Sequence, residues 1–151
     1  MSARSAETSV EMKMLEGLRG LSLPLPCVGL METADAGTAK EQDLSSVQVR
    51  THDFAQTYEA MEMFTLSAEI RLNVEQAESA DGGAFLEAHE KIALWLERLM
   101  MGDRCVELET AEAFVDGFRI VGGDKDFDTS GGVWFAVWNI ALNGRIKGQE
   151  A

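Results

Sequence analysis

The chain has 151 residues and an apolar fraction of 46%, which suffices for the core of a single domain and excludes disorder throughout. Its 26 acidic residues outnumber the 13 basic ones, which argues against a surface for nucleic acid or anionic membranes, since both require a cationic patch. The two cysteines, the lack of a long apolar run and the polar N-terminus predict a protein without disulfides, membrane span or signal peptide.

The N-terminal part of the chain predicts one short helix followed by irregular structure. We expect a loose arm over residues 1–7, and Thr8-x-x-Glu11 fits a capping box that would start a helix over residues 9–19. The Leu-Pro-Leu-Pro run that follows excludes a helix, and residues 27–31 predict a short edge strand. Residues 32–43 are small and polar, and they predict a long mobile loop.

Alternation of apolar and polar residues predicts the next strands. Val47 and Val49 indicate a strand over residues 44–50, whereas residues 52–63 fit either a turn or a loosely formed element. From Phe64 to Val74 the alternation is regular, which predicts a strand with one buried and one solvated face.

A helix is predicted over residues 84–101, with Asp81 as its N-cap and Gly102 at its end. Its core stripe repeats at helical spacing and consists of Phe85, Ala88, Ile92, Trp95, Leu96 and Leu99. Short strands are expected over residues 105–109 and 114–121, the second with a bulge at Gly117, before a turn-rich connection.

The last strand is expected over residues 131–142, because β-branched and aromatic residues fit a packed, pleated surface. Its even-numbered face holds Trp134, Ala136, Trp138, Ile140 and Leu142, for which the helix stripe or the sheet offers cover. Its odd-numbered face, led by Val133, Phe135 and Val137, is apolar too. Either a second layer of the same chain covers that face, or another subunit does. We favour the second reading and predict an interface at these three residues, with a homo-oligomer as the result.

These elements predict a single α+β domain over residues 1–151. The expected architecture is a mainly antiparallel sheet packed with one principal helix and a short N-terminal helix, because the last strands are joined by short connections. A short polar tail is expected over residues 144–151.

Asp124, Asp126 and Asp128 stand at the spacing that opens a calcium-binding loop, where oxygen ligands converge on a hard cation. The same loop would need glycine and glutamate where Thr129 and Phe135 stand, so a solvated acidic turn is the competing interpretation.

The remaining residue types do not form a recognisable catalytic pattern. His52 and His89 lack a partner at zinc-binding spacing, and neither Cys27 nor Cys105 has a local base. We therefore expect no catalytic residues, no metal and no cofactor, and we predict that the protein is not an enzyme.

A resemblance to a known family rests on the order, lengths and loose pattern of these stretches. They are the early helix over residues 10–18, Val47-Gln48-Val49, the strand 64–74, the helix 84–99, residues 118–123, Phe127-Asp128, residues 131–135 and Leu142-Asn143-Gly144. In this arrangement the chain resembles the tail terminator, or tail completion, proteins and related neck proteins of long-tailed bacteriophages.

The resemblance implies a small subunit that forms a homo-oligomeric ring, usually of six copies, with no catalytic residues. Such a ring caps the tail tube, contacts the tail tube protein and the neck or connector proteins, and lets DNA pass without binding it specifically. The expected location is the virion tail, after synthesis in the host cytoplasm. The alternative is a small acidic dimeric chaperone or adaptor for secretion or assembly, which the acidic composition and the size also fit.

Overall fold

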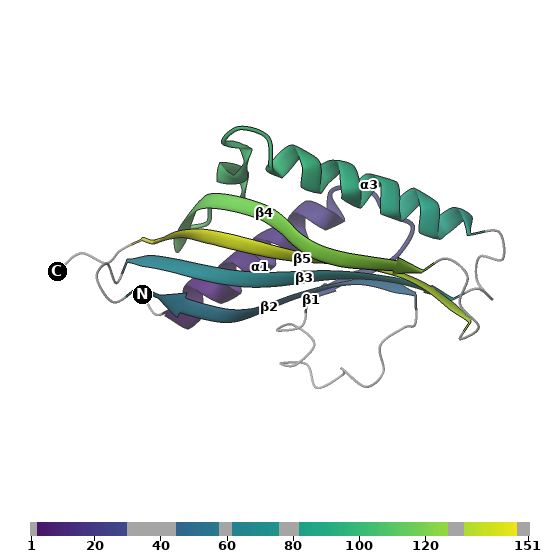
Figure 1. The fold of residues 1–151 in the computed structure, drawn as a ribbon, viewed down its shortest axis with the longest axis horizontal. Coiled ribbons are helices and arrows are strands. Elements are labelled where there is room, and N and C mark those ends of the chain that lie inside the picture. The colour runs from purple at the N-terminus through teal and green to yellow at the C-terminus, as the bar shows by residue number, and fades with distance from the viewer. Residues whose placement is uncertain (1–2, 30–44, 58–61, 76–81, 127–131, 148–151) are drawn as a thin grey trace.

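The computed structural model describes residues 3–29, 45–57, 62–75, 82–126 and 132–147 (Figure 1). Its elements in chain order are α1 (Ala3–Arg19), β1 (Cys27–Gly29), β2 (Ser46–Gln56), β3 (Met63–Glu75), α3 (Gly83–Leu99), the 3-10 helix η2 (Arg104–Leu108), β4 (Ala113–Asp126) and β5 (Val133–Ile146). The strands form one five-stranded sheet in the order β1-β2-β3-β5-β4. Only β1 and β2 run parallel among the described strands, so the domain is α+β and mainly antiparallel, as predicted.

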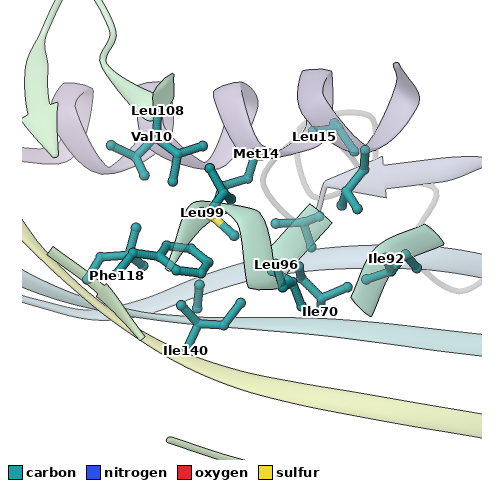
Figure 2. Close-up of a cluster of buried hydrophobic side chains, with 14 of the residues drawn as sticks. Val10, Met14, Leu15, Ile70, Ile92, Leu96, Leu99, Leu108, Phe118 and Ile140 are labelled. Atoms are coloured by element: carbon teal, nitrogen blue, oxygen red, sulfur yellow. The ribbon is translucent and has the colours of Figure 1, made fainter. Parts of the chain in front are cut away.

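Both helices lie on the same face of the sheet, which we call the helix face. In Figure 2, apolar side chains of α1 and α3 meet side chains of the central strands in one cluster; the labelled members are Val10, Met14, Leu15, Ile70, Ile92, Leu96, Leu99, Leu108, Phe118 and Ile140. The opposite face, which we call the open face, carries no helix within the described part of the chain (Figure 1).

Period-two alternation determines which side chains of the long strands are buried. Along β3 the side chains of Phe64, Leu66, Ala68, Ile70, Leu72 and Val74 are buried, which confirms the predicted strand. The register continues this layer into β5, where Ile70 faces Trp138 and Leu72 faces Ala136. The predicted even-numbered face of β5 is therefore the helix face, with Trp138 only half-buried at its surface.

Helix α3 is close to its predicted bounds, and Phe85, Ala88, Ile92, Leu96 and Leu99 of the expected stripe are buried. Trp95 of that stripe is half-buried and packs instead against α1. A Cβ added at Gly17 would lie 2.6 Å from Cζ2 of Trp95, so the absence of a side chain at Gly17 lets the two helices approach.

The predicted N-terminal arm is wrong, because α1 begins at Ala3 and has 17 residues, as many as α3. The apolar stripe of α1 extends to Ala6, which is fully buried. Packing of this stripe therefore stabilises the helix over residues that were expected to form the arm. The proposed capping box lies inside the helix. Glu11 is fully buried there. Its Oε1 accepts one hydrogen bond from the backbone amide of Thr51 at 3.0 Å and another from the Thr51 hydroxyl at 2.9 Å.

Further predictions need correction. Residues 105–109 do not form a strand, because Cys105 and Leu108 are buried three residues apart in η2, the spacing of a 3-10 turn. Strand β2 continues to Gln56 past an irregularity between His52 and Ala55. The polar tail begins later than expected, since β5 extends to Ile146, which is buried.

The sheet is centred on β3, and β5 lies between β3 and β4. Strand β4 also runs further than predicted, to Asp126, because the register pairs residues 122–126 with β5. The predicted loop over residues 32–43 lies outside the described residues. Neither α1 nor α3, in the part of the chain that is described, combines the length and apolarity needed to cross a bilayer.

Candidate functional site

The open face is built by alternate residues of the four long strands. In the register of the sheet, one row joins Arg50, Glu69 and Asn139, and the next joins His52, Ser67, Ala141 and Arg119. Most of this surface is polar, as expected for the solvated side of an antiparallel sheet. Three neighbouring apolar side chains lie together at one end of β5, and Phe114 of β4 lies near the other end, opposite Arg145.

The three neighbouring apolar side chains, which we call the apolar strip, are Val133, Phe135 and Val137, the three residues predicted as an interface. Each is only partly buried. Along β3 their register neighbours are Glu75, Asn73 and Arg71, so polar side chains border the strip. The structure thus brings the three predicted residues together on one surface that no described helix covers.

Charged side chains on the open face fall into two groups. Arg145 donates two hydrogen bonds to Asp116, at 2.9 Å and 3.1 Å, and Arg71 lies 3.4 Å from Glu69. The hydrogen bond from Arg145 lowers the pKa of Asp116 below its usual value. Arg50 and Arg119, in contrast, form no ion pair with any described residue.

A shallow cavity of about 370 Å³ lies on the same face near Arg119. Side chains of all four long strands line it, among them Asp53, Thr65, Ser67 and Asn143. Hydroxyl, amide and guanidinium groups therefore border the same surface as the apolar strip, and they can donate hydrogen bonds to a partner's polar groups.

The candidate metal ligands do not form a described site. Asp124 is exposed on β4, where its Oδ1 accepts a hydrogen bond from the amide of Lys125 at 2.8 Å. Asp126 ends β4, and Asp128 lies outside the described residues. Within the described ranges, no three histidine, cysteine, aspartate or glutamate side chains lie close enough together to hold a metal ion.

The two histidines lie on opposite faces of the sheet. His52 is on the open face, with Nδ1 at 2.9 Å from Oδ2 of Asp53. His89 is on the helix face, with its ring centroid 5.0 Å from that of Trp138 and 6.0 Å from that of Phe85. Burial lowers the pKa of His89, and nearby Lys125 lowers it further. A joint acid–base site of the two histidines is therefore not formed.

The cysteines are packing residues in this structure. Cys27 and Cys105 are both buried and free, and burial raises the pKa of each thiol. The Cys105 thiol points to the carbonyl oxygen of Val115 at 3.8 Å. Neither thiol has the electropositive, accessible setting of a reactive cysteine.

Comparisons of the chain with models of protein families and with curated protein sequences gave no match. The site is therefore interpreted from its own geometry.

Proposed function

We propose that the protein is a structural subunit of a bacteriophage tail, which assembles as a ring, caps the tail tube and joins it to the neck. One observation carries the proposal: the open face presents the apolar strip of Val133, Phe135 and Val137 beside polar rows, with no described helix over it. Surfaces that combine an apolar centre with a polar border are typical of contacts between proteins.

The apolar strip gives a physical reason for association. Transferring one apolar side chain of this size from water into a contact yields about 1.5–3 kcal/mol when burial is complete. Three such side chains in one row on a rigid strand lose little conformational freedom when a neighbour covers them, so the contact forms without refolding.

The order of elements and the overall charge support a tail subunit in particular. The two helices and the four long strands follow the order on which the resemblance to tail terminator proteins rests, and the short strand β1 is additional to it. The formal net charge of −13 suits a ring around a DNA channel, because its surface repels phosphates and leaves the DNA free to move.

A single substitution on the strip tests the proposal. We expect Phe135→Asp to remain a folded monomer, because a carboxylate at a partly exposed strand position is tolerated in solution and costs heavily inside a contact. The matched control is Val106→Asp, which adds the same charge in place of an exposed apolar side chain on η2, away from the open face.

Native mass spectrometry and negative-stain electron microscopy, with and without the tail tube protein of the same phage, provide the measurement. Wild type and Val106→Asp should form rings that cap tubes and stop their growth, whereas Phe135→Asp should do neither. A wild-type protein that stays monomeric with tubes present would overturn the proposal. A stable wild-type dimer that ignores tubes would favour the chaperone or adaptor alternative instead.

A further inference from the structure

Strand β4 lies at one edge of the sheet (Figure 1), and its outer side is open over much of its length. No described strand pairs with that side. Near the start of β4, η2 covers the edge, because the Cys105 thiol points to the carbonyl oxygen of Val115 there. Residues 121–125, in contrast, are all exposed, and the apolar Val121 is 55% exposed. An edge strand with free backbone groups can pair with a strand of another chain.

The register with β5 identifies the residues of β4 whose backbone groups lie on the outer side. A Cβ added at Gly123 would lie 2.4 Å from the carbonyl oxygen of Val137, so the backbone of Val137 is directed toward β4. Backbone groups alternate between the two sides of a strand in an antiparallel pair. The partners of the even-numbered residues of β5 therefore direct their backbone groups outward. They are Phe118, Ile120, Gly123 and Lys125.

These outward positions match those of a second copy of the same edge in an antiparallel pair. When Ile120 lies opposite Gly123 of the second copy, Phe118 lies opposite Lys125, so outward residues meet outward residues. The two-fold axis of this arrangement passes between residues 121 and 122. The edge is therefore complementary to itself, and each pair across the contact occurs twice.

The same arrangement brings opposite charges together. Arg119 lies opposite Asp124 of the second copy, and the symmetry repeats this pair. Both side chains are exposed on the open face, and neither forms an ion pair with a described residue. They share that face because the bulge at Ile120/Gly122 shifts the alternation between them. Opposite charges directly across an antiparallel pair are stabilising, and they offset part of the repulsion between two acidic chains.

The bulge at Ile120/Gly122 also fits the two-fold arrangement. A bulge usually protects an edge, because its extra residue puts a regular partner strand out of register. Here Val121 is the residue without a partner on β5, and it lies next to the axis on both strands. The residues on either side of the axis therefore stay in register. Gly122 lies opposite Val121 and has no side chain, which leaves room for the valine of the other copy.

We propose that the β4 edge of one copy pairs with the β4 edge of a second copy about a two-fold axis between Val121 and Gly122. Such a contact closes on itself, so it is separate from the contact proposed at the apolar strip and does not rest on the tail function. One pair of edge strands buries little surface, so the expected dissociation constant is on the order of 0.1–1 mM. Phe135→Asp is therefore a monomer at the low micromolar concentrations of native mass spectrometry and pairs only in concentrated solution.

Charge reversal in the Phe135→Asp chain tests the contact without the apolar strip. Sedimentation equilibrium should show dimers of Phe135→Asp at about 1 mM. Adding Arg119→Asp or Asp124→Arg should weaken pairing about ten-fold, because two pairs of like charges replace two pairs of opposite charges. An equimolar mixture of these two variants should pair as a heterodimer, and both changes in one chain should restore the homodimer. Arg50→Asp, a reversal at an exposed residue of β2, is the matched control and should leave pairing unchanged.

Cysteine cross-linking tests the alignment of the two strands. In the Phe135→Asp chain, an equimolar mixture of Arg119→Cys and Asp124→Cys should form a disulfide-linked heterodimer on oxidation. Either variant alone should not, because its two cysteines would be about 16 Å apart along the strands, beyond the reach of about 7 Å for a disulfide. Circular dichroism of each variant checks that the fold is retained.

The outcomes separate this inference from the proposed function. A Phe135→Asp chain that stays monomeric at about 1 mM would overturn the inference, whatever rings the wild type forms. So would a dimer that Arg50→Asp weakens as much as Arg119→Asp does, or cysteines that cross-link equally well in every combination. Failure of wild type to cap tubes would overturn the tail function alone, since pairing of the edges requires no tube.

Discussion

At the scale of single residues, Arg145 shows how a cation on the open face is held in place. Its Nε and Nη2 donate hydrogen bonds to the two carboxylate oxygens of Asp116, at 2.9 Å and 3.1 Å. Its guanidinium carbon also lies 4.6 Å from the centroid of the Phe114 ring. A bidentate pair fixes the guanidinium plane, so Arg145 has less freedom than Arg50 or Arg119 to meet a partner.

The same pair predicts a pH dependence of stability. The hydrogen bond from Arg145 lowers the pKa of Asp116 in the folded protein. The stabilisation is therefore fully present above the unfolded pKa of about 4, and it is lost as the pH falls through the lower folded pKa. We expect Asp116→Asn to lower the urea midpoint slightly at pH 7, and we expect a smaller difference from wild type at about pH 2, where more of the Asp116 carboxylate is protonated.

Urea unfolding followed by circular dichroism at both pH values checks this expectation. Glu107→Gln, which removes an exposed acid on η2 that pairs with Arg98 at 3.2 Å, serves as a comparison for loss of charge away from the sheet. An equal midpoint difference between Asp116→Asn and wild type at both pH values would contradict the account.

Sequence reasoning at the residue scale predicted that the residues of the apolar strip share a face, but it did not predict that Arg119 lies on the same face. Val133, Phe135 and Val137 share a face because β5 alternates without interruption, and alternation can be read from the sequence. Strand β4 is different, because bulges interrupt its register at Val115/Gly117 and Ile120/Gly122. Each bulge shifts the alternation, so Arg119 and Asp124 share the open face although five positions separate them.

At the scale of elements, the contact between α1 and α3 depends on one glycine. Glycine within a helix usually costs about 1 kcal/mol relative to alanine, so Gly17→Ala would be stabilising in an isolated helix. In this structure the added Cβ would lie 2.6 Å from the Trp95 ring, which is too close for an unshifted side chain.

We therefore expect Gly17→Ala to lower the free energy of unfolding, with a cost of about 1–3 kcal/mol for overpacking. Trp95→Leu should remove the clash, so the double variant Gly17→Ala/Trp95→Leu should be more stable than the sum of the single effects by about 1–2 kcal/mol. Urea denaturation of the four proteins measures this coupling. Stabilisation by Gly17→Ala alone would show that the helices are not in close contact at this point.

The elements that the sequence predicted well are those whose periodicity comes from one buried face. Strand β3 and helix α3 are examples, since each presents a regular apolar series to the same core. The start of α1 was missed because Thr8 and Glu11 fit a capping motif, whereas Glu11 in fact serves a buried contact with Thr51 of β2. This contact joins residues that are 40 positions apart in the chain, so it cannot be predicted from a local sequence pattern.

At the scale of the whole molecule, the two sides of the sheet differ in what covers them. The helix layer lies on one side of the sheet, and the open face lies on the other (Figure 1). A subunit of this kind has a direction, so copies that associate through both surfaces follow one another in the same orientation. The net charge of −13 opposes non-specific aggregation, because copies of the chain repel one another.

The central claim is that copies of the chain meet at the apolar strip of β5 in an assembled ring. Its most direct test replaces Phe135 with the photo-cross-linking residue p-benzoylphenylalanine and irradiates rings formed on tail tubes from an equal mixture of light and isotopically labelled chains. The same replacement at Val106, an exposed residue of η2, serves as the control. The account predicts a ladder of covalent multimers in which position 135 is joined to a different copy, and no such ladder from position 106. Irradiated rings that yield only monomers from position 135 would contradict it.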